Sequence, residues 1–151
     1  MKLKNKLLQI AFGLLCLLFF SNINFAQIKI PSPKLVFDGT EEYENGQISH
    51  TIYWLSVENR DNFPDETFEV ASDLPPCGKN TNASRSWIEV RSSANKRLNS
   101  FCGIKSPIEL NKLSFSLQKG EKPPKFVYLL MVDRRTGKKY SSNLAEIKIP
   151  K

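Results

Sequence analysis

Cys77 and Cys102 are the residues of this chain most able to carry chemistry. They lie 25 positions apart, and a glycine follows each. Cysteine thiolates can bind zinc, attack substrates, exchange disulfides or form a stable bridge. A zinc site takes about four Cys or His ligands, and the only other ones in the sequence are Cys16 and His50. A redox pair would usually be spaced Cys-x-x-Cys, which is absent, so we expect a structural disulfide.

The beginning of the chain indicates the compartment in which such a bridge would persist. Lys2, Lys4 and Lys6 precede a nearly unbroken apolar run over 7–20, and Asn24-Phe25-Ala26 follows. This layout is typical of a secretory signal peptide over residues 1–26, and the run is shorter than the ~20 residues of a spanning helix. We therefore expect export to the periplasm or the exterior, and one domain over 27–151. Cleavage would remove Cys16, leaving an even number of cysteines in an oxidising compartment.

Other residues that could do chemistry form no recognisable catalytic or metal-binding motif. His50 lies in a strand pattern, where we interpret it as a strand residue rather than a pH-sensitive group. Paired carboxylates can cleave glycosides or hold calcium, but no calcium-loop motif is present. We interpret the acidic residues of the expected loops as solvated turn residues: Glu41, Glu42, Glu44, Asp65 and Glu66. We expect no catalytic residue, no cofactor and no metal, with a structural calcium left open.

Charge offers one candidate site, at a predicted hairpin over 133–140. The chain has a formal net charge of +7, which falls to +4 once the three signal-peptide lysines are removed. The predicted hairpin has four cations and a tyrosine at its tip: Arg134, Arg135, Lys138, Lys139 and Tyr140. This cluster favours an anionic partner such as a polysaccharide, a lipid headgroup or an acidic protein face. A well-hydrated tip without a ligand is the alternative. A two-residue Thr136-Gly137 loop would set cations opposite one another, so we prefer a three-residue loop over 135–137. It gives Gly137 a left-handed conformation and pairs Asp133 with Lys139.

The elements that would position these residues are strands, because apolar residues recur with a period near two. In 48–57 the alternation places Tyr53, Leu55 and Val57 on one face, with Ile52 and Trp54 on the other. Residues 126–132 are apolar on both faces and predict a central strand. Further strands are expected at 34–37, 67–70, 86–92, 97–101, 113–117 and 138–147, and a single helical turn at 106–113. Turn signals separate these strands, and Asp38-Gly39 and Asn45-Gly46 predict a loop over 37–47. Seven or eight short strands divided in this way predict an all-β antiparallel β-sandwich.

Two segments resemble fibronectin type III and immunoglobulin-like domains. "TIYWLSVEN" is similar to an early strand carrying its core tryptophan, Trp54, and "FVYLLMVDRRTGKKYSSN" is similar to the last two strands, with Tyr128 as a core or corner tyrosine. The pattern "LPPCG…SRSWIEV…FCG…VYLLMVDRRTG" also resembles a group of uncharacterised exported bacterial proteins. The resemblance implies a shared fold and brings no activity.

Together these features predict an exported, disulfide-stapled binding or structural module. We expect a protein or an anionic envelope component as its partner, no nucleic acid, and no membrane span in the mature chain. The alternatives are a small extracytoplasmic enzyme, an enzyme inhibitor, or an accessory subunit, which an exposed apolar patch near either "IKIP" segment would favour.

Overall fold

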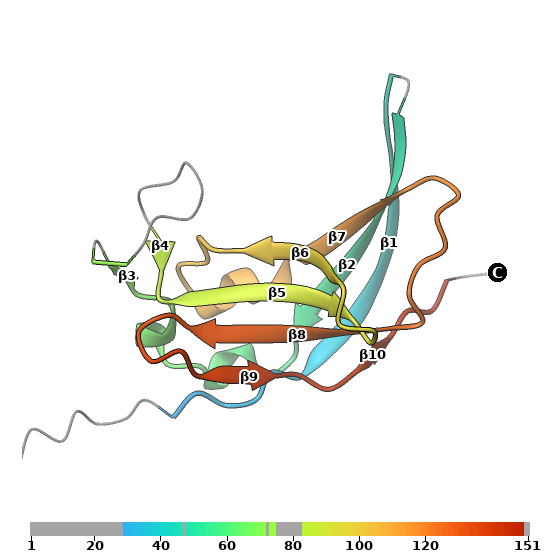
Figure 1. The fold of residues 1–151 in the computed structure, drawn as a ribbon. Coiled ribbons are helices and arrows are strands. Elements are labelled where there is room, and N and C mark those ends of the chain that lie inside the picture. Colours follow the sequence, from blue (N-terminus) through green and yellow to red (C-terminus); the bar gives the residue numbers. More distant parts are fainter. Residues whose placement is uncertain (1–28, 47, 72, 75–82, 150–151) are drawn as a thin grey trace, which may run out of the picture.

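The computed structural model describes residues 29–46, 48–71, 73–74 and 83–149 (Figure 1). Within them lie ten strands and three short 3₁₀ helices, in an antiparallel all-β fold. The expected signal peptide, Cys16 and Cys77 lie outside the described residues. No helix among the described residues has the length and apolarity needed to cross a membrane.

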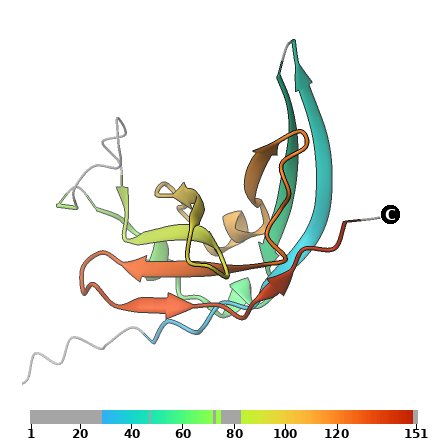
Figure 2. The same cartoon turned by 45° about the vertical axis from the view of Figure 1, so that its right-hand side comes forward.

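A three-stranded sheet is built around one long hairpin. Strand β1 (Leu35–Asn45) pairs along its whole length with β2 (Ile48–Val57), and β2 pairs with β7 (Leu113–Gln118). The β2–β7 pairing ends at His50, so the end of the hairpin has no third strand beside it. Figures 1 and 2 both show this end standing beyond the rest of the molecule. We call it the arm, formed by residues 43–45 and 48–50.

A five-stranded sheet has β8 (Phe126–Asp133) at its centre. One side of β8 pairs with β5 (Ser86–Ser92), which in turn pairs with β6 (Arg97–Phe101). The other side pairs with β9 (Lys139–Ser141) near the end of β8 and with β10 (Ala145–Glu146) near its start. A separate two-stranded ladder joins β3 (Val70–Ala71) and β4 (Ala83–Ser84).

Both sheets contribute to one hydrophobic core. On the three-stranded sheet, Tyr53 stacks on Phe115 with ring centroids 4.7 Å apart. From the five-stranded sheet, Ile88, Val90 and Leu129 are fully buried in the same cluster. The 3₁₀ helices η1 (Arg60–Asn62), η2 (Asp65–Phe68) and η3 (Pro107–Asn111) lie in the connections, and Phe68 and Leu110 add to this core. This shared core fixes which face of each sheet remains outside.

The period-two pattern is confirmed where it was clearest. Strands β5 and β6 have the predicted bounds, and β2 presents Tyr53, Leu55 and Val57 to the core. Trp54, in contrast, was predicted in the core but lies half-buried on the outer face, where its Nε1 donates to Glu41 Oε2 at 3.0 Å. The core aromatic residue of β2 is Tyr53, because the alternation of the strand puts its neighbour on the other side.

Three other local predictions are wrong. The predicted loop over 37–47 is mostly strand: Asp38-Gly39 forms a β-bulge rather than a turn, with Gly39 at φ 140°. Of the strand expected over 67–70, Thr67 and Phe68 belong to η2, and only Val70 lies in a strand, β3. The strand expected over 138–147 is divided into β9 and β10. In each case local residue preferences give way to tertiary packing.

Candidate functional site

The β8–β9 hairpin carries the five residues predicted to meet an anionic partner. Its turn spans four residues, 134–137, and the Gly137 amide donates to the Asp133 carbonyl at 2.7 Å. Gly137 has φ 71°, the left-handed conformation expected for it. The predicted register is wrong by one residue, because Lys139 lies opposite Val132, and the Asp133 amide donates instead to the Lys138 carbonyl at 2.9 Å.

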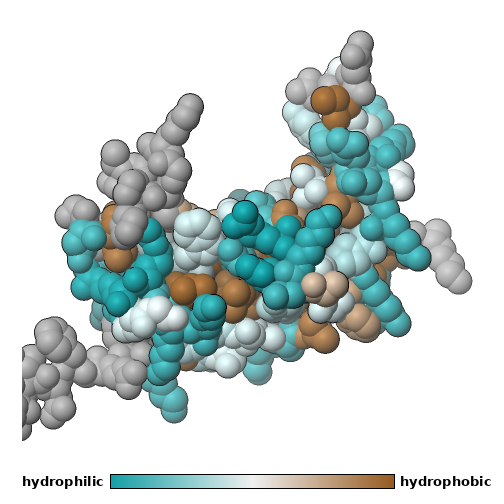
Figure 3. Space-filling model, viewed as in Figure 1, coloured by the Kyte–Doolittle hydropathy of each residue, from teal (hydrophilic) through white to brown (hydrophobic). Residues whose placement is uncertain are grey.

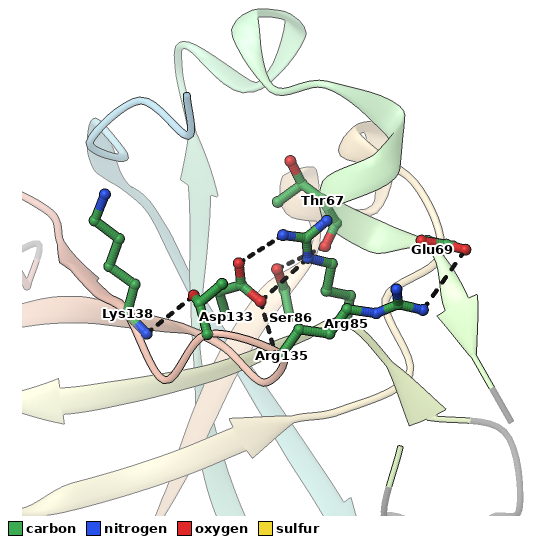
Figure 4. A network of polar contacts seen from close by, with 8 residues as sticks. Thr67, Glu69, Arg85, Ser86, Asp133, Arg135 and Lys138 are labelled. Carbon is green, nitrogen blue, oxygen red and sulfur yellow. Dashed lines mark hydrogen bonds and ion pairs between the residues drawn. The ribbon is translucent and has the colours of Figure 1, made fainter. Parts of the chain in front are cut away.

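The Asp133 carboxylate explains this register, because distant residues hold it (Figure 4). Arg85 donates to it twice, from Nε to Oδ1 at 3.1 Å and from Nη2 to Oδ2 at 2.8 Å. The Arg135 amide donates to Oδ1 at 3.0 Å. The Asp133 side chain is 3% exposed and that of Arg85 12%. A buried two-point contact of this kind orients both groups and fixes the end of β8.

The electrostatics of this pair are those of a structural contact. Burial alone would raise the pKa of Asp133, but the hydrogen bonds from Arg85, the Arg135 amide and Thr136, with the positive charge of Arg85, lower it below its usual value. The hydrogen bond to Asp133 likewise raises the pKa of Arg85. Both groups therefore stay ionised near neutral pH, and neither is poised to exchange a proton.

The other cations of the hairpin differ in their surroundings. Arg134 Nη1 donates to the Ser84 carbonyl at 3.3 Å. Arg135 reaches across to the acidic side chains of Glu69 and Asp73, at 3.9 and 3.5 Å. Protein groups thus occupy both arginines.

The two lysines remain directed at the surface. The Lys138 Nζ lies 6.0 Å from the centre of the Tyr140 ring, and Lys139 is exposed. A site for an anion at this tip would therefore rest mainly on Lys138, Lys139 and Tyr140.

Only one cysteine of the predicted bridge lies within the described residues. Cys102 is half-buried at the end of β6, and its carbonyl accepts the Ser84 amide at 3.2 Å. Cys77 lies outside the described residues, so the bridge stays a prediction. Trp87, on the strand between the two cysteines, is half-buried with its Nε1 enclosed and unpaired.

Sequence reasoning missed the most exposed apolar side chains of the three-stranded sheet. Tyr43 and Ile48, on the two strands of the arm, are 50% and 55% exposed. Figure 3 shows hydrophobic surface at the end of the arm, set among hydrophilic residues. The alternation of β2 already placed Ile48 on the face of Ile52 and Trp54. The stretch 37–47 was interpreted as a loop, so no strand was expected to carry Tyr43.

Grooves and possible metal ligands are the other features from which a site could be built. The described residues contain no group of three His, Cys, Asp or Glu side chains placed to hold a metal ion. One open groove of about 350 Å³ lies at the base of the arm, lined by Ile48, Ser49, Gln118 and Lys119. Another of about 280 Å³ lies between β1 and β10. Both are open surface depressions suited to contact with a large partner rather than to enclosing a small substrate.

Comparison with protein-family models, with curated proteins and with solved structures gives no match for this chain. The function is therefore argued from its own residues.

Proposed function

We propose that this protein is an exported β-sandwich that acts as a binding module, with a protein or an envelope surface as its partner. The observation that carries the proposal is the arm. Single exposed apolar side chains are common on soluble proteins, but neighbouring ones that project together from the surface mark contact sites. Tyr43 and Ile48 project in this way. Tyrosine is also enriched where proteins meet, because one side chain offers both apolar area and a hydroxyl group.

The strand order supports an immunoglobulin-like or fibronectin type III-like layout. In such domains strands A, B and E share one sheet and strands C, F and G the other. Here β1, β2 and β7 form one sheet in the order expected for A, B and E, while β5, β8 and the β9–β10 edge stand in the order expected for C, F and G. This layout leaves the outer face of each sheet open to a partner, and it hosts many functions.

Export and the disulfide belong to the same proposal. An oxidising compartment would keep a Cys77–Cys102 bridge closed, and closing a loop of that size would add roughly 3 kcal/mol on the chain-entropy model. Mass spectrometry of the secreted protein without reductant should show a first residue of Gln27 and no alkylatable thiol. Two reactive thiols would contradict the bridge.

The binding role can be tested by capture from an envelope extract. The double variant Tyr43→Ser, Ile48→Ser removes the exposed apolar groups of the arm. Its matched control is Ile108→Ser, because Ile108 is 60% exposed on η3, which precedes the end of β7 that lies farthest from the arm. We expect the arm variant to lose the captured partner and the control to keep it. Equal capture by all three proteins would contradict the arm as the contact.

A second candidate contact is the lysine-bearing tip of the β8–β9 hairpin. The exposure of Lys139 and the position of Lys138 over Tyr140 favour it. Neutralising both lysines to glutamine should abolish retention on an anionic polysaccharide column or on anionic lipid vesicles. The variant Arg135→Gln should change retention little, because Arg135 already faces Glu69 and Asp73. Unchanged retention of the double-lysine variant would remove this candidate.

A further inference from the structure

The outer face of the three-stranded sheet is continuous from the arm to the middle of β2. Alternation places Ile48, Ile52 and Trp54 opposite to the core-facing side chains of β2. The register sets Tyr43 beside His50 and Glu41 beside Ile52 on that same outer face. The bond from Trp54 Nε1 to Glu41 confirms the shared side. The face therefore combines aromatic and aliphatic groups over both strands of the hairpin.

The charge on this face is of one sign. Strands β1, β2 and β7 contain four carboxylates and no lysine or arginine: Asp38, Glu41, Glu42 and Glu44. On the outer face, Asp38 accepts from Ser56 Oγ at 3.0 Å and Glu41 from the Trp54 indole. Both donors are neutral, so they orient the carboxylates without cancelling their charge.

The remaining two carboxylates lie on the other side of the hairpin. Glu42 accepts from Thr51 at 2.8 Å, and Glu44 lies 3.5 Å from the Lys119 ammonium. Among the ion pairs of the described residues, the Glu44–Lys119 contact is the only one that involves a carboxylate of this sheet. Asp38 and Glu41 thus give the outer face a negative charge that nothing in the described protein offsets by an ion pair.

We propose that this outer face docks a basic, apolar polypeptide segment of a partner protein, with an arginine or lysine of that segment lying against the Trp54 ring and its charge at Glu41. The proposal rests on the binding function proposed above and names the chemistry of the partner. Cations are attracted to the face of an indole ring, and more strongly where a carboxylate stands beside it. Apolar side chains of the same segment would cover Ile52, Ile48 and Tyr43.

The charge of the outer face also argues against a dimer in which two copies of the protein pair through this face. A symmetric pairing of two outer faces would bring Asp38 and Glu41 of one molecule against those of the other, and like charges brought together in an interface are costly. A basic segment meets the opposite condition, and its attraction should weaken with salt because the contact lies at the surface.

The test uses two synthetic peptides of equal length, one alternating Leu and Lys and the other alternating Leu and Glu. Binding of each fluorescently labelled peptide to the full mature protein is followed by anisotropy at low and high salt. We expect the Lys peptide to bind, its affinity to fall as salt rises, and the Glu peptide not to bind. Binding of both peptides, or of neither, would overturn the proposed partner chemistry.

Variants assign the binding to this face. The double variant Asp38→Asn, Glu41→Gln keeps oxygen acceptors in place and should weaken binding of the Lys peptide by about tenfold, and Trp54→Ala by a similar factor. The control variant Asp65→Asn, Glu66→Gln removes the same two charges from exposed positions on η2 and should bind as the unchanged protein does. Thermal melting of each variant shows that it is folded. Equal weakening by the control would overturn the assignment.

Two further outcomes distinguish a failure of this proposal from a failure of the binding function on which it rests. If the variant Asp38→Asn, Glu41→Gln still captures the envelope partner while the arm variant does not, the binding function stands and the basic partner is overturned. If the protein alone shows a concentration-dependent mass that this variant abolishes, the occupant is a second copy, and the proposal for a separate partner falls.

Discussion

The central strands of the five-stranded sheet and the long hairpin of the three-stranded sheet hold their acidic side chains in opposite ways. In the five-stranded sheet Glu89 and Asp133 are both buried, and arginines hold them: Arg91 lies 2.6 Å from Glu89, and Arg85 forms a two-point contact with Asp133. In the three-stranded sheet the carboxylates are exposed, and mostly neutral donors contact them. The first arrangement gives structural rigidity, whereas the second leaves charge available to a partner.

The largest effect is expected where the three-stranded sheet meets the core. The change Phe115→Ala removes the ring that stacks on Tyr53 and should lower the free energy of unfolding by about 3–5 kcal/mol. Trp54→Ala, on the opposite face of the same sheet, should lower it by no more than about half as much, because Trp54 is only half-buried. Urea denaturation of the two variants measures both values. Similar losses would mean that the outer face is structural.

The next effect concerns the buried pair of the five-stranded sheet. Arg85→Met leaves the Asp133 carboxylate buried without its charged partner and should cost about 3 kcal/mol of unfolding free energy. Adding Asp133→Asn removes the uncompensated charge, while Asn can still accept the Arg135 amide, so the double variant should recover much of the loss. Denaturant titrations of the single and double variants check this, and a double variant no more stable than Arg85→Met would contradict it.

A smaller effect on the free energy of unfolding compares one carboxylate from each sheet. Glu89→Gln removes the charge that faces Arg91 at a buried position and should cost about 1–2 kcal/mol. Glu42→Gln, exposed on β1 and hydrogen-bonded by Thr51, should change stability by less than about 0.5 kcal/mol. Thermal melting of the two single variants makes the comparison. Equal losses would remove the contrast between the sheets.

The smallest expected effect is that of pH on the free energy of unfolding. It should be absent near neutral pH and appear only in acid. Because the folded-state pKa of Asp133 is lowered, its ionised form contributes stability above the pKa that the group has when unfolded. That contribution is lost as pH falls through the folded-state pKa. The unchanged protein should therefore lose more stability than Asp133→Asn between neutral and acid pH, as measured by denaturant titrations at each pH. Parallel losses would contradict the proposed role of this carboxylate.

How much of the fold could be predicted depended on how far apart the interacting residues lie. Alternation over 48–57 separated the two faces of β2 correctly, because a strand buried on one face has apolar residues at every second position. It did not show which face is buried, and the resemblance placed Trp54 rather than Tyr53 in the core. The bulge at Gly39 could not be predicted from local signals, because Asp-Gly reads as a turn, and only pairing with β2 keeps the strand continuous. The prediction of the β8–β9 register was wrong for a related reason, because Asp133 is held by Arg85, which lies 48 positions away in the sequence.

The candidate site was predicted only in part. Clustered charges at 134–139 marked the basic hairpin, but the sequence did not show that Glu69 and Asp73 would face Arg135. The outer face of the three-stranded sheet was missed because its acidic residues lower strand propensity, so the stretch was interpreted as a loop. The absence of lysine and arginine from β1, β2 and β7 becomes visible only once the pairing of these strands is known.

The side chain of Asn143 has a consequence for the order in which the molecule can be assembled. Its Oδ1 accepts the Leu35 amide at 2.8 Å and its Nδ2 donates to the Leu35 carbonyl at 3.0 Å, so one side-chain amide caps the free edge of β1 at its first residue, across 108 positions of sequence. Contacts of such long range form slowly and late. During synthesis this edge must stay open until residue 143 has emerged, so the chain spends most of its production time with an uncapped strand, the period in which a chaperone would be most useful to it.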